Sequence, residues 1–322
     1  MVSGDESAVK LAVIGAGKWG INHIRSLYEL GLSPYAIVDV DPGKKVIANK
    51  YKSKFFTRYE DVLDEVDAVI VATPTDTHYE IVKNCLKAGK NVLVEKPIAE
   101  NSRQGKELVN MADKMNLILS VGYLYRFNNS IRRLKEIINE IGEIQYITSR
   151  YIHSTKPPRK DSGVIMNLGI HVVDILNFIL NEIPREVYAV KKNLLSEVYE
   201  DSAIMVLSYD NFFASIELSC SHPLKARDMW IIAEKEKVYL DYFNQKMVRY
   251  PIKVSYEKIE KKEPIEEKIN RNEPLKEELK YFITLVEKGE VEENLGRENY
   301  YTTRICELCL KSAELGKELI VE

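Results

Sequence analysis

The sequence has few cysteines, no long apolar run and no excess of positive charge. Four cysteines in 322 residues are too few for a disulfide scaffold. No window offers the roughly 18 consecutive apolar residues of a membrane span, and the polar stretch from Met1 to Lys10 lacks a signal peptide's apolar segment. The 46 basic and 49 acidic residues nearly cancel, which disfavours binding to a nucleic-acid backbone. We expect a cytoplasmic protein that binds neither nucleic acid nor membranes.

Two of the cysteines, Cys306 and Cys309, form a CxxC pair. Such a pair occurs in zinc and redox sites, but no second pair of ligands accompanies it here. Apolar residues recur around it at helical spacing. The pattern favours two buried helix thiols, and we predict no metal site.

The segment from Val9 to Val121 alternates short apolar runs with amphipathic stretches. The runs are KLAVIG, AIVDV, DAVIVA, NVLVE and LILSVG, and the stretches between them carry apolar residues three and four apart. This alternation is typical of βαβ units, in which crossover helices cover a parallel sheet. We predict an α/β protein whose residues 1–123 form a doubly wound Rossmann domain.

The rhythm changes after Tyr123, where most segments alternate as strands do and few look helical. This pattern predicts an α+β domain over residues 124–295, with a large, mainly antiparallel sheet that holds the substrate. Residues 209–212 (YDNF) lie between two alternating segments and read as a tight hairpin turn. The alternation leaves one sheet face in need of cover, so we also expect a homodimer or homotetramer formed through this domain.

A GxGxxG motif follows the first predicted strand and opens a helix. In such a motif the first glycine makes the tight turn, the second lets the backbone approach a pyrophosphate, and the third lets helix and strand pack closely. The predicted cofactor loop consists of Gly15, Ala16, Gly17, Lys18, Trp19 and Gly20.

Asp39 ends the second predicted strand, where a carboxylate can accept hydrogen bonds from the ribose hydroxyls of adenosine. The same carboxylate would repel a 2'-phosphate, so we expect NAD as the cofactor, with NADP less favoured. Lys44 and Lys45 lie close enough in sequence to keep NADP open.

Two later segments end predicted strands at the carboxyl edge of the sheet, where ligands of such folds bind. The first supplies Ala72, Thr73, Pro74, Thr75 and His78, which we expect on the nicotinamide side. For His78 an equally good interpretation is a helix residue that only satisfies backbone groups. The second is Glu95-Lys96-Pro97, which puts a lysine beside the expected nicotinamide, where it can bind or protonate a substrate oxygen. We assign Glu95 and Lys96 to the cofactor site as well.

The order of GAGKWG, ATPTDTH, EKP, GYLYRFN and GVIMNLGIHVVD resembles that of the glucose-fructose oxidoreductase and inositol dehydrogenase family over nearly the whole chain. The resemblance implies that Lys96 and His171 flank the reacting carbinol as catalytic residues. It also implies that a helix from Arg297 to Leu319 packs on the Rossmann domain, which would then comprise residues 1–123 and 296–322, with Tyr301 near the substrate.

Asn167 and His171 are four residues apart on a predicted helix, which places both on one face. Many sugar and inositol dehydrogenases of the family carry an aspartate where Asn167 stands; an amide can position a hydroxyl but cannot relay its proton. Asp174, three residues beyond His171, can orient a neighbouring group. The helix is most similar to that of the nucleotide-sugar 3-dehydrogenases, which oxidise UDP-N-acetylglucosamine or its uronic acid.

Cationic residues lie near these positions and complete the predicted substrate site. The loop before the helix supplies Lys156 and Arg159, which suit a diphosphate, although an exposed basic loop is an equally good interpretation. Arg126, after the last Rossmann strand, is a further candidate for contact with the substrate or the cofactor.

We therefore expect an NAD-dependent dehydrogenase that oxidises a sugar hydroxyl, in the preferred case the 3-hydroxyl of a UDP-N-acetyl sugar. Its proton goes to Lys96 or His171, a choice that the sequence leaves open. An inositol or free-sugar dehydrogenase, an enzyme that recycles its own NAD with a second substrate, and a non-catalytic NAD-sensing regulator remain as alternatives.

Overall fold

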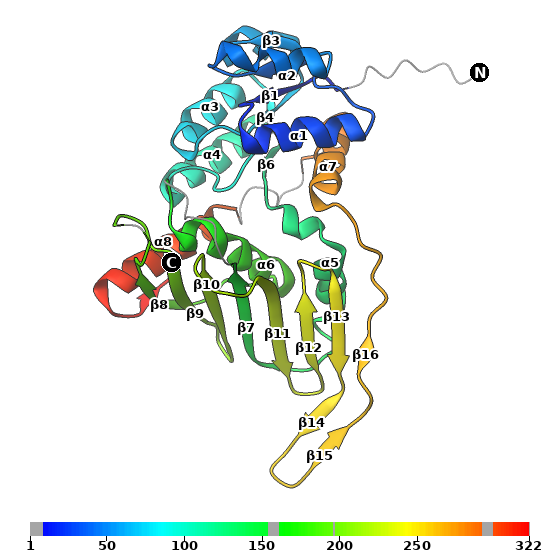
Figure 1. The fold of residues 1–322 in the computed structure, drawn as a ribbon, viewed down its shortest axis with the longest axis vertical. Helices are drawn as coiled ribbons and strands as arrows, with labels where there is room; N and C mark the ends of the chain where they lie inside the picture. The colour runs from blue at the N-terminus through cyan, green and yellow to red at the C-terminus, as the bar shows by residue number, and fades with distance from the viewer. Residues whose placement is uncertain (1–8, 154–160, 196, 292–298, 322) are drawn as a thin grey trace, which may run out of the picture. The chain divides into compact units, whose positions relative to one another are not determined.

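A computed structural model describes residues 9–153, 161–195, 197–291 and 299–321 and divides the chain into two compact units. The first unit comprises the chain up to Leu124 together with Leu275–Tyr300. The second comprises Tyr125–Pro274 and Tyr301–Glu322. Each unit has a large β-sheet of its own (Figure 1).

The first unit is built on a six-stranded parallel sheet in the order β3-β2-β1-β4-β5-β6. Because the strands are parallel, their carboxyl ends meet at one edge of the sheet. The central strands β1 and β4 are buried along their whole length, as expected when helices cover both faces. The strands are β1 (Leu11–Ile14), β2 (Ala36–Val38), β3 (Lys54–Phe56), β4 (Ala68–Val71), β5 (Asn91–Val94) and β6 (Leu119–Val121).

Helices connect these strands and bury their apolar stripes against the sheet (Figure 1). α4 begins where the Asn101 side chain accepts a hydrogen bond from the backbone N–H of Gln104, and it ends at Asn116 in the left-handed conformation. The connecting helices are α1 (Lys18–Glu29), α2 (Lys45–Lys50), α3 (Thr75–Lys87) and α4 (Ser102–Met115), with short 3₁₀ turns η1 (Pro42–Lys44) and η2 (Tyr59–Glu65). The later helix α7 (Pro274–Lys288) packs in the same core, and η3 (Leu124–Phe127) continues the chain from the first unit into the second.

The second unit is built on a nine-stranded sheet in the order β16-β13-β12-β11-β7-β10-β9-β8-β17. Its neighbours are antiparallel except β10 and β7, so the predicted fold class is confirmed. The predicted hairpin turn is also confirmed, since the Tyr209 N–H donates to the carbonyl oxygen of Phe212 between β9 and β10. The strands are β7 (Ile144–Ile152), β8 (Glu186–Lys192), β9 (Ser202–Ser208), β10 (Phe213–Ser219), β11 (Ala226–Ala233), β12 (Lys237–Asp241), β13 (Lys246–Tyr250), β16 (Ile265–Glu266) and β17 (Leu319–Ile320).

Helices cover one face of this sheet (Figure 1). Gly169 lies against the side chains of Met205 and Leu218 on β9 and β10, and the Ser312 hydroxyl of α8 accepts a hydrogen bond from the N–H of Ala189 on β8. These helices are α5 (Asn129–Ile137), a π-helical turn η4 (Ile165–Gly169) that runs into α6 (Ile170–Leu180), and α8 (Asn299–Leu315). Cys306 and Cys309 lie buried in α8, which confirms the predicted buried helix thiols.

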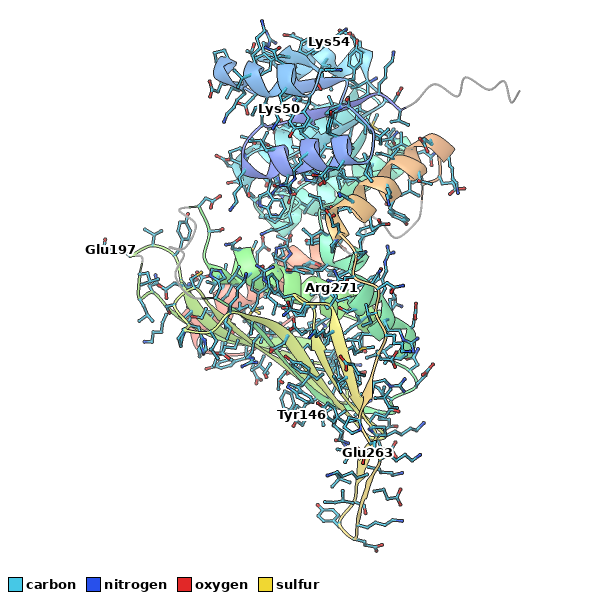
Figure 2. The ribbon with its side chains drawn as sticks, turned by 45° about the vertical axis from the view of Figure 1, so that its right-hand side comes forward. Lys50, Lys54, Tyr146, Glu197, Glu263 and Arg271 are labelled. Atoms are coloured by element: carbon cyan, nitrogen blue, oxygen red, sulfur yellow. The ribbon has the colours of Figure 1, made fainter. Side chains whose placement is uncertain are left out.

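The opposite face of the sheet exposes apolar and aromatic side chains. Tyr146, labelled in Figure 2, stacks on Phe213 across β7 and β10, with ring centroids 5.8 Å apart. The ring centroid of Trp230 lies 4.9 Å from that of Tyr239 on the neighbouring strand. Four side chains of this face remain between 38% and 49% exposed: Tyr146, Val190, Ile204 and Phe213. A further two-stranded hairpin, β14 (Ile252–Val254) and β15 (Ile259–Lys261), extends from β13 (Figure 1).

The carboxyl-terminal part of the chain divides differently from the prediction, which gave residues 296–322 to the Rossmann domain. It is α7 that joins the first unit, because Leu279, Phe282 and Ile283 enter the core under its sheet. α8 from Tyr301 onward and β17 belong to the second unit, because β17 pairs with β8. Among the described residues, every helix is too short or too polar to cross a lipid bilayer.

Candidate functional site

The glycine motif forms the turn between β1 and α1. Gly15 has a φ of +95°, in the left-handed region that suits glycine. A Cβ atom on Gly15 would lie 2.7 Å from the carbonyl oxygen of Ala72, and one on Gly20 would lie 1.8 Å from that of Gly15. A Cβ atom on Gly17 would meet nothing within 4 Å. Gly15 therefore allows close packing against the end of β4, and Gly20 lets α1 pack closely on the turn, whereas Gly17 faces open space.

The amino end of α1 is available to an anion. Gly17 caps this helix without any side-chain hydrogen bond, and the first turn contains no acidic residue. Lys18 is exposed there, and Trp19 is half-buried. Unsatisfied backbone N–H groups and the positive end of the helix dipole both favour a phosphate at this position.

Asp39 lies beside the glycine turn, at the end of β2. Its carboxylate accepts hydrogen bonds from the N–H of Ala16 at 2.7 Å and from the N–H of Asp41 at 2.9 Å. The side chain is half-buried, so part of the carboxylate also faces solvent. Together the glycine turn, the helix end and Asp39 provide a turn, N–H donors and an acceptor, which fit a dinucleotide.

His78 is buried, and both of its ring nitrogens face backbone carbonyl oxygens. Nδ1 lies 2.8 Å from the oxygen of Pro97, and Nε2 lies 3.0 Å from that of Thr73. Burial is the main cause that lowers the pKa of His78, so the neutral ring donates to one of these oxygens at a time. The ring thus joins the loop after β4, where Pro74 and Thr75 begin α3, to the loop after β5. This placement matches the interpretation of His78 as a group that satisfies the backbone.

Lys96 follows β5 at the carboxyl edge of the sheet. Lys96 is only 7% exposed, and a cis peptide bond joins it to Pro97. The neighbouring Glu95 is held from the other side, because its Oε1 lies 2.8 Å from Nε2 of the buried His23 on α1. Glu95 therefore ties α1 to the strand that carries Lys96. This role of His23, which lies three residues after Gly20, had not been predicted.

In the second unit, aromatic rings surround His171, which is buried near the start of α6. The Tyr125 ring meets it edge-on, with centroids 5.3 Å apart, and the Tyr151 ring stacks on it at 6.0 Å. Tyr242 meets the Tyr125 ring edge-on at 5.3 Å. Burial is the main cause that raises the pKa values of Tyr151 and Tyr242 well above the ordinary range, so both hydroxyls stay protonated. These rings fix the plane of the imidazole.

Arg126 and Asp174 form a forked ion pair in the same unit. Nε of Arg126 lies 2.9 Å from Oδ1 of Asp174, and Nη2 lies 2.6 Å from the same oxygen. The Asp174 side chain is 1% exposed and that of Arg126 is 15% exposed. A buried carboxylate held in this way orients the guanidinium, as the sequence analysis suggested for Asp174.

Asn167 precedes His171 by four residues, but the turn between them is not purely α-helical. It belongs to η4, whose π-helical hydrogen bonds span five residues, so its turn holds more residues than an α-helical turn. The carboxylate of the buried Glu200 accepts a hydrogen bond from the N–H of Ile165 and holds the start of this turn. A turn of slightly more than four residues still keeps positions four apart near one face, so the placement of Asn167 beside His171 stays a prediction. Glu200 is a positioning residue that had not been predicted.

The remaining predicted substrate residues are Lys156, Arg159 and Tyr301. Lys156 and Arg159 lie outside the residues that the structure describes. Tyr301 is half-buried in α8 and belongs to the second unit. The structure thus brings Arg126, Asp174 and His171 into the second unit, and the glycine loop, Asp39, Glu95 and Lys96 into the first.

Comparison with known proteins decides the family. Residues 9–123 match the oxidoreductase family with an NAD-binding Rossmann fold, and residues 131–239 match the GFO/IDH/MocA C-terminal domain. The chain belongs to the GFO/IDH/MocA family. It is accordingly an oxidoreductase whose first unit binds NAD.

Individual relatives in this family act on sugars and polyols. UDP-N-acetylglucosamine 3-dehydrogenase of Acidithiobacillus ferrooxidans is 25% identical over 75% of this chain and 77% of that enzyme. Its solved structure matches with a TM-score of 0.85 at 22% identity over 96% of this chain and 98% of its own. Myo-inositol 2-dehydrogenase of Thermotoga maritima is 30% identical over 62% of this chain and 65% of that enzyme.

A levoglucosan dehydrogenase, solved with NADH and levoglucosan, matches with a TM-score of 0.86. It is 17% identical to this chain over 98% of this chain and 100% of its own. At these identities the structural likenesses establish the GFO/IDH/MocA fold alone.

Proposed function

We propose that this member of the GFO/IDH/MocA family oxidises a secondary hydroxyl of a sugar, with Lys96 and His171 as its catalytic residues. The observation that carries the proposal is the buried Lys96 at the carboxyl edge of a sheet whose neighbouring turn fits a dinucleotide. Ligands of such sheets bind at this edge, so Lys96 places a group that can handle a proton where a substrate would lie.

The proposed step converts a ring CH–OH into a ketone. NAD supplies the acceptor for the hydride that leaves the carbinol carbon. The hydroxyl proton passes to Lys96 Nζ or to a ring nitrogen of His171, and the electron pair of the O–H bond completes the carbonyl group. Asn167 hydrogen-bonds a neighbouring hydroxyl, and Asp174 keeps Arg126 in place.

We propose a UDP-N-acetyl sugar, oxidised at its 3-hydroxyl, as the substrate. The support is the 25% identity to the Acidithiobacillus enzyme and an asparagine at position 167. Asp39 supports NAD over NADP, because a 2'-phosphate would face a carboxylate. The second candidate substrate is myo-inositol, which the 30% identity to the Thermotoga enzyme favours.

A substrate panel tests the proposal. We expect reduction of NAD by UDP-N-acetylglucosamine or its uronic acid, and slower reduction by myo-inositol, glucose and glucose 6-phosphate. Each sugar is assayed with NAD and with NADP, in the presence of a 2-oxo acid that would regenerate trapped cofactor. Oxidation of inositol without any response to UDP-sugars would replace the first substrate by the second. Faster reaction with NADP would contradict the role of Asp39.

We also propose that the exposed sheet face of the second unit joins copies of the chain into a homodimer or homotetramer. Its apolar side chains, among them Ile204, are those that a solvent-exposed sheet usually lacks. Ile204→Glu should convert the oligomer into a monomer, measured by light scattering. Val46→Glu, a change at a position of the first unit that is 69% exposed, should leave the mass unchanged. A monomeric wild-type protein would disprove this proposal.

A further inference from the structure

Arg227 on β11 is inserted among the aromatic rings of the second unit. Its Nη1 donates a hydrogen bond to the Tyr125 hydroxyl at 2.8 Å. Its guanidinium carbon lies 4.5 Å from the ring centroid of Tyr151 and 5.0 Å from that of Phe243. The side chain is half-buried. The guanidinium is thus held in one position by two ring faces and one hydroxyl.

No carboxylate neutralises this guanidinium among the residues that the structure describes. Other arginines of the same unit differ in this respect, since each of the following pairs with an aspartate or a glutamate: Arg126, Arg133, Arg150 and Arg249. A partly desolvated cation without an anionic partner is unfavourable, and cation–π contacts offset only part of that loss. An anionic ligand would complete the site.

The neighbouring groups do not supply the missing negative charge. Burial keeps the hydroxyls of Tyr151 and Tyr242 protonated, because it raises their pKa values. Lys225 adds a second cation, with Nζ 4.1 Å from the centroid of the Phe243 ring that Arg227 also contacts. Two cations beside one ring raise the local positive potential and strengthen the attraction for an anion.

Arg227 shares its rings with the proposed catalytic histidine. Tyr125 contacts both Arg227 and His171, and Tyr151 lies between the same two groups as a ring neighbour of each. A substrate whose hydroxyl reaches His171 therefore lies near the guanidinium, because one tyrosine side chain contacts both groups. This proximity assigns Arg227 to the substrate and not to a separate surface site.

We propose that Arg227 binds an oxyanion of the substrate, so that the enzyme prefers an acidic sugar derivative to a neutral one. The planar guanidinium fork matches a carboxylate or a phosphate with two parallel N–H···O bonds. The anion is a carboxylate of a sugar acid or the diphosphate of a nucleotide sugar. The inference rests on the proposed function only in taking a sugar derivative as the substrate.

Binding measurements on the full chain test this site without any need for turnover. Calorimetric titrations use D-glucuronate, UDP and D-glucose as probes, with NADH at saturation so that the dinucleotide site is filled. Arg227→Gln should weaken the binding of at least one anionic probe by about 10- to 100-fold, the effect of losing a charge-assisted hydrogen bond. The probe that responds identifies the source of the anion, glucuronate for a carboxylate and UDP for a diphosphate. The affinity for D-glucose should stay the same.

Two further variants separate recognition from damage to the fold. Arg150→Gln removes an arginine whose Nε lies 2.9 Å from the Asp228 carboxylate, and it should keep both anion affinities. Arg227→Lys keeps the charge in case Arg227→Gln does not fold, but it should still weaken the responding probe, because the planar fork is lost. Unchanged anion affinities in the Arg227 variants, an equal loss for glucose, or wild-type protein that binds neither anion would overturn the inference. If no sugar of the substrate panel is oxidised, the proposed function is rejected, but these binding results remain valid.

Discussion

Replacing Lys96 by methionine is expected to lower kcat by about 10²- to 10⁴-fold, the usual contribution of a positioned proton donor or acceptor. Methionine keeps much of the length of the side chain and removes the ammonium group. The Kd for NAD should remain near its wild-type value, because the glycine turn, the start of α1 and Asp39 are untouched. Steady-state kinetics and calorimetric titration with NAD measure the two effects separately.

Lys90→Met is the matched control for this experiment. Lys90 immediately precedes β5, so it lies at the opposite end of the strand that leads to Lys96. Its replacement should leave both kcat and NAD affinity unchanged. A Lys96→Met enzyme with wild-type kcat would show that the buried lysine is structural.

His171→Asn extends the same measurement into a double-mutant cycle. Lys96 belongs to the first unit and His171 to the second, and the kinetics of the double variant test whether they act on the same step. Groups that act on one proton are strongly non-additive, whereas groups that act on separate steps multiply their effects. We expect the double variant to be little slower than the slower single variant. Multiplied losses would assign the two residues to different steps.

The parallel sheet was predictable because its central strands are buried on both faces. In β4, for example, all four residues (AVIV) are apolar and buried. In the helices between the strands, apolar residues recur three and four positions apart. The assignment of the last helices was not predictable in the same way. An apolar stripe indicates that a helix packs, but not which sheet it covers, and this holds for α7 and α8 alike. The core contacts of Phe282 and the pairing of β17 with β8 decide it.

In the candidate site, too, the parts built from local contacts were predictable and the parts built from distant contacts were not. The glycine turn is a local motif, so its three glycines could be assigned from spacing alone. The rings that contact His171 belong to Tyr125 and Tyr151, and no spacing rule joins either of them to the histidine. The π-helical turn of Asn167 was missed because its sequence has the same apolar pattern as an α-helix, while a distant carboxylate, that of Glu200, holds its start.

Alanine substitutions at Gly17 and Gly20 should both weaken NAD binding, but only the second should destabilise the fold. At Gly20 the new Cβ would lie 1.8 Å from the carbonyl oxygen of Gly15, so α1 and the turn must separate. Overpacking of this kind costs about 1 to 3 kcal/mol of folding free energy. The backbone N–H groups that face the pyrophosphate would shift as well, and losing two charge-assisted hydrogen bonds weakens NAD binding by roughly 100-fold or more.

At Gly17 the new Cβ would meet no protein atom within 4 Å, so the unfolding temperature should stay at the wild-type value. If the pyrophosphate approaches the backbone here, the same methyl group occupies its place, and NAD affinity should fall about 10- to 100-fold through the loss of one such hydrogen bond. Thermal unfolding without ligand and calorimetric titration with NAD, run on both variants, separate the two effects. Wild-type NAD affinity in Gly17→Ala would mean that the open space beside Gly17 is not where the pyrophosphate binds.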